Sequence, residues 1–178
     1  DTVQSELDSL EYTIEQAKKA GNEKDVKRLE LLRNAIEQGE AFTPRNLVRK
    51  YGGASRRIND NRDYVFGFLM NPEYNGLDVI RYFMGISVSQ DVLLDEEAGN
   101  SLPRTVKRLE IPAFFVMGKY DYMTSVKAAK DYFDALEAPV KDFVIFGQSA
   151  HYPQFEEKEK FAAWLKQIFN QINCGCLH

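Results

Sequence analysis

The pattern of apolar and polar positions predicts a helical hairpin at the start of the chain. Between residues 1 and 20 the apolar side chains recur three and four positions apart, which places them on one face of a helix. Residues 23–38 show the same spacing. Gly21 and Asn22, which lie between these segments, are typical of a helix stop followed by an N-cap. We therefore expect two helices joined by a very short turn.

Helices are also expected through the rest of the first hundred residues. Thr43, which a proline follows, predicts the N-cap of a third helix that ends at the next pair of glycines. The apolar residues within 55–71, 76–86 and 88–97 predict further helices. No segment in this part of the chain alternates apolar and polar residues as a half-buried strand would. Residues 1–102 are therefore expected to form a mostly helical region.

The pattern changes at residue 103. Two short apolar runs, 113–117 and 142–146, predict buried strands, and helices are predicted after them at 123–136 and 154–172. Strand, helix, strand and helix in this order predict parallel strands with helices on both faces of the sheet. The expected fold class is therefore α/β, with short parallel strands and flanking helices after a helical region. The expected division of the chain is 1–102, 103–173 and a tail, 174–178.

Composition excludes several classes of protein. The 178 residues are 44% hydrophobic and 12% aromatic, which is enough for a core and argues against disorder. A formal net charge of -4 gives no basic field, so nucleic acid is not an expected partner. No apolar run has the length of a membrane span, and the first twenty residues lack the apolar core of a signal peptide. We expect a cytoplasmic protein.

The two cysteines lie in the tail and predict no cofactor or metal. Cys174, Cys176 and His178 form a C-x-C-x-H cluster, but a structural zinc site normally needs four ligands. Two cysteines are too few for a disulfide framework. We expect a frayed terminus with reduced thiols.

The candidate chemistry is a carboxylate and an imidazole that follow successive predicted strands. Asp121 comes three residues after Gly118, where the first strand stops, and His151 follows the second strand. Reactive groups in open α/β sheets lie at the carboxyl ends of the strands. Each residue alone has a plain alternative: Asp121 as a turn former or helix N-cap, and His151 as a surface histidine. Their order along strand, turn, helix, strand and loop favours a catalytic pair.

Short motifs surround both residues. They are Ile111-Pro112 before Gly118-x-x-Asp121, then Phe146-x-x-Ser149-Ala150-His151-Tyr152-Pro153, then Glu156-Glu157 and Phe161. This segment resembles the C-terminal part of α/β-hydrolase-fold proteins, especially the branch that includes the proline iminopeptidases. The resemblance implies a serine hydrolase of esters, amides or small peptides, in which Asp121 orients His151 and His151 activates the nucleophile. It also implies that residues 1–102 are the helical cap, or lid, of such an enzyme.

The serine nucleophile of that family is missing from the sequence. The family places it in a G-x-S-x-G elbow between a strand and a helix. Three serines come near this motif: Ser55 and Ser87 lack the second glycine, and Ser149 runs directly into the expected base. For Ser149 we expect a hydrogen bond within its loop. The chain is therefore expected to be the C-terminal portion of a hydrolase, inactive by itself, with its nucleophile outside these residues.

Two strands alone make a marginal sheet with exposed edges. The expected partners are a missing N-terminal half or a second copy of the chain, in addition to a small-molecule or peptide substrate. Cleavage at the cap boundary is a third explanation. Two other functions remain open: an epoxide or haloalkane hydrolase whose nucleophile is an Asp in the missing half, and a non-catalytic interaction module on the same scaffold.

Other side chains are weaker candidates. Glu6 is a candidate for holding a substrate's amino terminus, with a solvated helix surface as the favoured alternative. Six aromatic residues are candidates for a pocket lining, with packing of the cap against the core as the favoured alternative. These six are Phe42, Tyr64, Phe66, Phe68, Tyr82 and Phe83. Trp164, Phe161 and Phe169 of the last helix are expected in the core.

Overall fold

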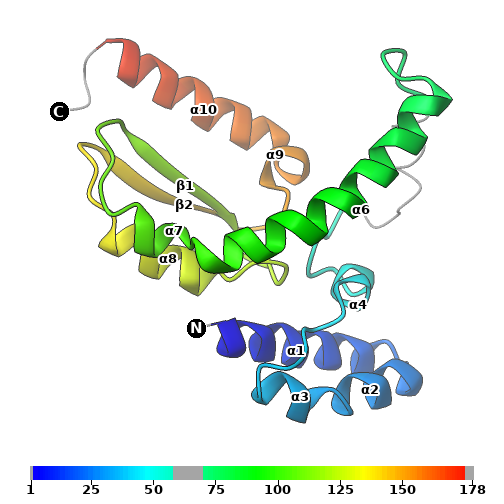
Figure 1. The fold of residues 1–178 in the computed structure, drawn as a ribbon. Coiled ribbons are helices and arrows are strands. Elements are labelled where there is room, and N and C mark those ends of the chain that lie inside the picture. Colours follow the sequence, from blue (N-terminus) through cyan, green and yellow to red (C-terminus); the bar gives the residue numbers. More distant parts are fainter. Residues whose placement is uncertain (1, 58–69, 175–178) are drawn as a thin grey trace. The chain divides into compact units, whose positions relative to one another are not determined.

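A computed structural model describes the chain over residues 2–57 and 70–174 (Figure 1). It divides into two compact units. The first combines Asp1–Asn59 with Leu109–His178, and the second is Asp60–Arg108. The N-terminal helices and the two strands thus share one unit, although they are far apart in the sequence.

The predicted N-terminal hairpin is confirmed, with one added break. Helix α1 spans Thr2–Lys19, α2 spans Glu23–Glu30 and α3 spans Arg33–Glu37. A turn at residues 31 and 32 divides the single helix predicted over 23–38. Gly21 has a φ of +66°, which favours glycine, and the Asn22 side chain accepts a hydrogen bond from the Asp25 N–H at 3.1 Å. Seven apolar residues form the core of this region: Leu10, Ile14, Ala17, Val26, Leu29, Ile36 and Leu47.

The start of helix α4, Arg45–Lys50, differs from the prediction. Its N-cap is Pro44, and the Thr43 side chain does not cap it. The Thr43 hydroxyl instead donates to the Glu6 carbonyl at 2.8 Å, while the Thr43 N–H donates to the Glu6 carboxylate at 2.9 Å. Arg45 forms an ion pair with the same carboxylate. Glu6 is buried, so the favoured expectation of a solvated helix surface is wrong. Its carboxylate connects α4 to α1, and a role in holding a substrate stays untested.

The two predicted strands are confirmed and run parallel. Strand β1, Ala113–Gly118, pairs with β2, Lys141–Phe146, in a register that places Gly118 opposite Phe146. Helix α8, Val126–Ala135, connects them. The last predicted helix is divided into α9, Pro153–Glu156, and α10, Lys158–Asn173, because Glu157 leaves helical geometry with φ -124° and ψ 48°.

Alternating aromatic side chains direct the two faces of the sheet to different helices. Phe115 makes edge contacts with Tyr132 and Phe133 of α8. Its neighbour Phe114 contacts Trp164 of α10 in the same way. Successive strand residues point to opposite faces, so α8 and α10 cover the sheet from opposite sides, as Figure 1 also shows. This arrangement of helices around a small parallel sheet is compatible with the α/β class.

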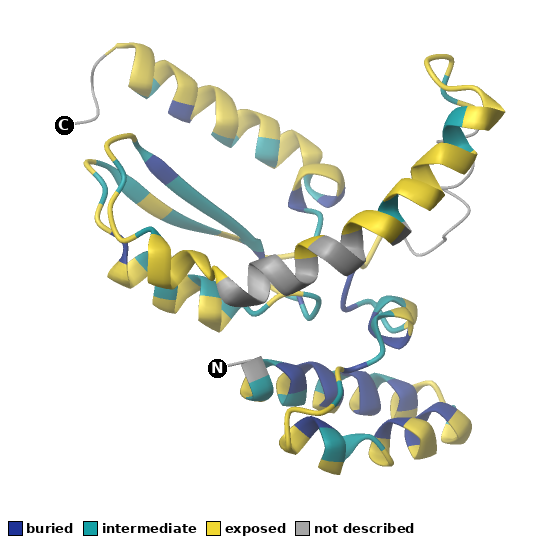
Figure 2. Ribbon diagram, in the orientation of Figure 1, coloured by how far each residue is buried: buried dark blue, intermediate teal, exposed yellow. Residues whose placement is uncertain are grey.

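Much of α10, which covers one face of the sheet, stays exposed (Figure 2). Phe169 of α10 is 64% exposed, so its predicted place in the core is wrong, while Trp164 and Phe161 are half-buried. Phe42 is also exposed. Other exposed apolar side chains in this part of the unit are Ile111, Ile145, Phe155, Leu165 and Ile172.

The second unit contains α6, Gly76–Gly99, and α7, Leu102–Thr105. Asn75 and Asp78 form a reciprocal cap at the start of α6: the Asn75 side chain accepts from the Asp78 N–H, and Asp78 accepts from the Asn75 N–H. The helices predicted over 76–86 and 88–97 are one continuous helix, because no proline or turn interrupts it. The helix predicted over 55–71 lies largely outside the described residues, as do Tyr64, Phe66 and Phe68.

Two aromatic residues lie next to each other on α6. Tyr82 and Phe83 of α6 are at least half exposed, and their rings contact each other edge to face. Within residues 2–57 and 70–174, no helix combines the length and the apolar character needed to cross a bilayer.

Candidate active site

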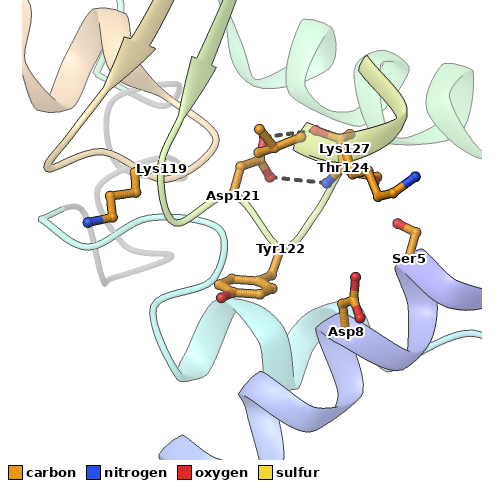
Figure 3. A pocket seen from close by; sticks show the side chains of 9 residues that line it. Ser5, Asp8, Lys119, Asp121, Tyr122, Thr124 and Lys127 are labelled. Atoms are coloured by element: carbon orange, nitrogen blue, oxygen red, sulfur yellow. Dashed lines mark hydrogen bonds between the residues drawn. The ribbon is translucent and has the colours of Figure 1, made fainter. Parts of the chain in front are cut away.

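The turn after β1 holds the Asp121 carboxylate in one orientation (Figure 3). The Asp121 N–H donates to the Gly118 carbonyl at 3.2 Å, which closes the turn. One carboxylate oxygen, Oδ1, accepts from the N–H groups of Met123 and Thr124 at 2.9 and 3.0 Å. The other oxygen, Oδ2, accepts from the Thr124 hydroxyl at 2.7 Å. Asp121 is only 7% exposed, so these bonds replace the water that a buried carboxylate needs.

The loop after β2 brings His151 to that carboxylate. Nδ1 of His151 lies 2.9 Å from Oδ2 of Asp121. Because the carboxylate accepts, Nδ1 carries the proton, and in the neutral ring Nε2 is the basic nitrogen. The hydrogen bond that Nδ1 donates to Asp121 raises the pKa of His151, although partial burial and the charge of Arg49 oppose the rise. Sequence order thus correctly predicted that these two residues meet, while their catalytic role stays a prediction.

The two loops approach each other closely beyond the ends of the strands. The Tyr120 N–H donates to the Ser149 carbonyl at 3.0 Å, which extends the strand pairing into the loops. Gly118 makes this approach possible: a Cβ there would lie 1.8 Å from the Ala150 carbonyl oxygen and 2.6 Å from that of Ser149. The glycine that ends β1 therefore lets the His151 loop pass directly over the Asp121 loop.

A third segment, from Gly53 to Arg57, joins both loops. The Gly53 carbonyl accepts from the Tyr122 N–H at 2.9 Å, and the Ala54 carbonyl accepts from the His151 N–H at 2.9 Å. Neither the glycine pair that ends at Gly53 nor the near-match to the serine motif at Ser55 predicted this structural role. No local pattern indicates that role, since its partners lie far along the chain.

The serines near the site donate their protons to glutamates. Ser55 is buried, and its hydroxyl donates to Glu156 at 3.0 Å. Ser149 is also buried, and its hydroxyl donates to Glu157 at 2.7 Å, as expected for a bond within the loop region. The side chain of Ser87, on α6, lies outside what the structure describes. Among the described residues, no side chain forms a hydrogen bond to Nε2 of His151, so neither Ser55 nor Ser149 is placed as its nucleophile.

A small cavity of about 160 Å³ lies on the α1 side of the Asp121 turn (Figure 3). Ser5 and Asp8 of α1 line it together with Tyr122, Thr124 and Lys127. His151 is not one of its lining residues. A substrate in this cavity would not meet the imidazole, so we do not assign it as a substrate site.

The tail differs from its prediction. Cys174 is disulfide-bonded, so the expectation of a reduced thiol there is wrong. Cys176 and His178 lie outside the described residues. Among the residues that the structure describes, no three potential ligands gather in a cluster that could hold a metal ion.

Comparisons with known proteins bear on the family to which the chain is related. The chain is 30% identical over 116 residues to the "Probable aminopeptidase YbaC" of Bacillus subtilis (strain 168), covering 65% of this chain and 36% of that protein. It is 36% identical over 84 residues to the "AB hydrolase superfamily protein YclE" of the same organism, covering 42% of this chain and 30% of that protein. No family model and no solved structure matches.

These similarities support a relationship to the α/β-hydrolase family at modest identity. The names of the two relatives indicate a hydrolase of the α/β fold. The chain spans about a third of the length of these curated relatives.

Proposed function

We propose that this chain is the C-terminal portion of an α/β-fold serine hydrolase of the proline iminopeptidase-like branch. In this proposal Asp121 is the triad acid, His151 is the general base, and the serine lies outside these residues. The observation that carries it is the 2.9 Å contact between Nδ1 of His151 and the buried Asp121 carboxylate. Residues 1–102 are assigned to the cap and residues 103–173 to the C-terminal part of the core.

The geometry suits proton transfer at Nε2. Nε2 of His151 would take the hydroxyl proton of the serine as its oxygen attacks the carbonyl carbon of the substrate. The same proton would pass to the departing amine or alcohol as the bond to the acyl carbon breaks, which leaves an acyl-enzyme. Water would then give a proton to Nε2 and attack the acyl group, and the proton would return to the serine. Asp121 would remain ionised throughout and stabilise the charged imidazole.

The proposed substrates are small peptides or amides with a free amino terminus. This choice rests on the relative named as a probable aminopeptidase, which matches 65% of this chain. Asp121 and His151 alone do not select a substrate, because the same pair serves ester and amide hydrolysis.

The decisive experiment uses a longer protein that includes the residues encoded before Asp1. We expect this protein to hydrolyse an aminoacyl 4-nitroanilide and to be labelled by a fluorophosphonate, while the 178-residue chain does neither. His151→Gln in the longer protein should abolish both reactions. Lys158→Gln, which changes an exposed residue of α10, is the matched control. Labelling of the 178-residue chain alone would contradict the proposal that the nucleophile lies elsewhere.

We further propose that the exposed apolar residues around the sheet are covered by the missing half or by a second copy of the chain. Leu165 and Phe169 of α10 are 50% and 64% exposed, and Ile145 of β2 is 49% exposed. Apolar patches of this kind mark interaction surfaces. Size-exclusion chromatography with mass measurement tests this: we expect self-association of the chain, and a cooperatively unfolding monomer would contradict it.

A further inference from the structure

We propose that Glu156 is a positioning residue for His151: its buried carboxylate locks the His151 loop to the segment formed by residues 53–57. Glu156 lies in the short helix α9, five residues after the imidazole, and is 3% exposed. It touches neither Asp121 nor the imidazole in any contact of the described residues. Its effect on His151 must therefore pass through the backbone.

Each carboxylate oxygen of Glu156 holds a different segment. Oε2 accepts from the N–H of Ala150, the residue directly before His151, at 2.7 Å. Oε1 accepts from the Ser55 hydroxyl at 3.0 Å and from the N–H of Arg57 at 2.8 Å. The Arg56 N–H donates to the same oxygen. Four donors thus meet one buried carboxylate and compensate for its lost hydration.

The lock closes a small ring of hydrogen bonds at the backbone of His151. The Ala54 carbonyl accepts from the His151 N–H at 2.9 Å, so the segment touches the His151 loop directly. Glu156 makes the second connection between the same two segments, through Ala150 on one side and Ser55 on the other. With both connections in place, the backbone of residues 150 and 151 cannot rotate away from the Asp121 turn without breaking several buried hydrogen bonds.

Glu157, the next residue along the chain, does not connect the His151 loop to residues 53–57 as Glu156 does. Glu157 accepts from the Gln148 N–H and the Ser149 hydroxyl, so it connects α9 only to the nearer part of the same loop. Of the two glutamates, Glu156 reaches across to a segment about a hundred positions earlier in the sequence.

The test measures the imidazole itself by NMR in the 178-residue chain, whose only other histidine, His178, serves as the internal reference. Glu156→Gln removes the charge, and Glu156→Asp keeps the charge but shortens the reach. In both variants we expect the pKa of His151 to fall towards that of an ordinary histidine, and the low-field Nδ1–H signal to weaken. Glu159→Gln, on an 83% exposed side chain of α10, is the matched control and should leave both readouts unchanged.

The outcomes separate positioning from other roles. A raised His151 pKa that persists in both folded Glu156 variants would overturn the proposal, because Glu156 would then serve stability alone. A His151 pKa that falls in Glu156→Gln but not in Glu156→Asp would also overturn the proposal, because the charge of Glu156 and not its position would then be the cause. If either variant fails to fold, Ser55→Ala, which removes one of the four donors, should still lower the pKa by a smaller amount; an unchanged pKa would refute the lock.

The importance of this lock for catalysis rests on the proposed function, whereas its effect on the imidazole does not. If the protein proves to be no hydrolase, a fall in the pKa of His151 in the Glu156 variants would still support the positioning role. Activity of the longer protein that survives both Glu156 substitutions, with the pKa of His151 unchanged, would remove the lock and keep the hydrolase.

Discussion

Replacing Gly118 by alanine tests whether the close approach of the two loops holds the Asp121–His151 pair together. The added Cβ would lie 1.8 Å from the Ala150 carbonyl oxygen, whereas ordinary contact begins at 3.4 Å. The atoms in the way are backbone, so no side-chain rotation relieves the clash. The φ of Gly118 is not in the left-handed region, so the effect is steric and not a matter of backbone strain.

The loss of stability in Gly118→Ala can be worked out from the movement that the added Cβ forces on the His151 loop. The His151 loop has to retreat by roughly the 1.6 Å between these two distances, which disrupts the bond from the Tyr120 N–H to the Ser149 carbonyl and lengthens the Asp121–His151 contact. Inserting a methyl group into a packed site costs about 1–3 kcal/mol, and each lost hydrogen bond costs about 1 kcal/mol. We therefore expect the free energy of unfolding to fall by about 2–4 kcal/mol, as measured by urea denaturation.

Gly147→Ala is the control, because a Cβ at this glycine, also at the end of a strand, meets nothing within 4 Å. This variant should unfold with a midpoint close to that of the wild type. In the longer protein, a displacement of this size in Gly118→Ala should lower kcat/KM by about a hundredfold. An unchanged unfolding midpoint in Gly118→Ala, together with an unchanged His151 pKa, would refute the argument from close approach.

Two further predictions concern charge. Asp121→Asn should lower the pKa of His151, measured by NMR, because an amide N–H replaces the carboxylate acceptor; a persisting raised pKa would contradict the assigned contact. The folded-state pKa of His151 is raised, so its contact with Asp121 stabilises the fold fully below the unfolded-state pKa. This stabilisation is lost as the pH rises through the folded-state pKa. The difference in stability between the wild type and Asp121→Asn should therefore shrink over that pH range. Glu6→Ala should cost about 1–3 kcal/mol in thermal or urea unfolding because it leaves the buried Thr43 N–H without its acceptor, and an unchanged stability would argue against this role. Glu11→Gln, which changes an exposed ion pair on the same helix, should cost little.

Local patterns predicted the elements of this chain well. The 3.6-residue spacing identified α1, and the stop and cap at Gly21 and Asn22 appear as predicted. The apolar runs identified both strands, and the order of elements placed Asp121 and His151 at the same end of the sheet. These features depend on neighbouring residues, so their signal is present in short windows of the sequence.

What the sequence did not predict depends on long-range contacts. Thr43 looks like an N-cap, but its hydroxyl is used by Glu6, thirty-seven positions earlier. Phe169 is a large apolar residue and yet is exposed. Its burial depends on whether another element packs on its side of α10, which the local sequence does not encode. The buried role of Glu156 was invisible because three of its four donors lie about a hundred residues away. Such pairs are fixed by the fold and leave no mark on local periodicity.

The contacts of the N-terminal helices change what a cap can mean in this chain. Ser9 of α1 donates to the Tyr122 carbonyl at 2.8 Å, and the Tyr12 ring stacks on that of Tyr122 with centroids 3.8 Å apart. Tyr122 directly follows Asp121, so α1 packs on the same turn that orients the carboxylate. A swing of α1 away from this turn would break the stack and expose the backbone that holds the proposed triad acid. The N-terminal helices are therefore part of the scaffold that holds the Asp121–His151 pair.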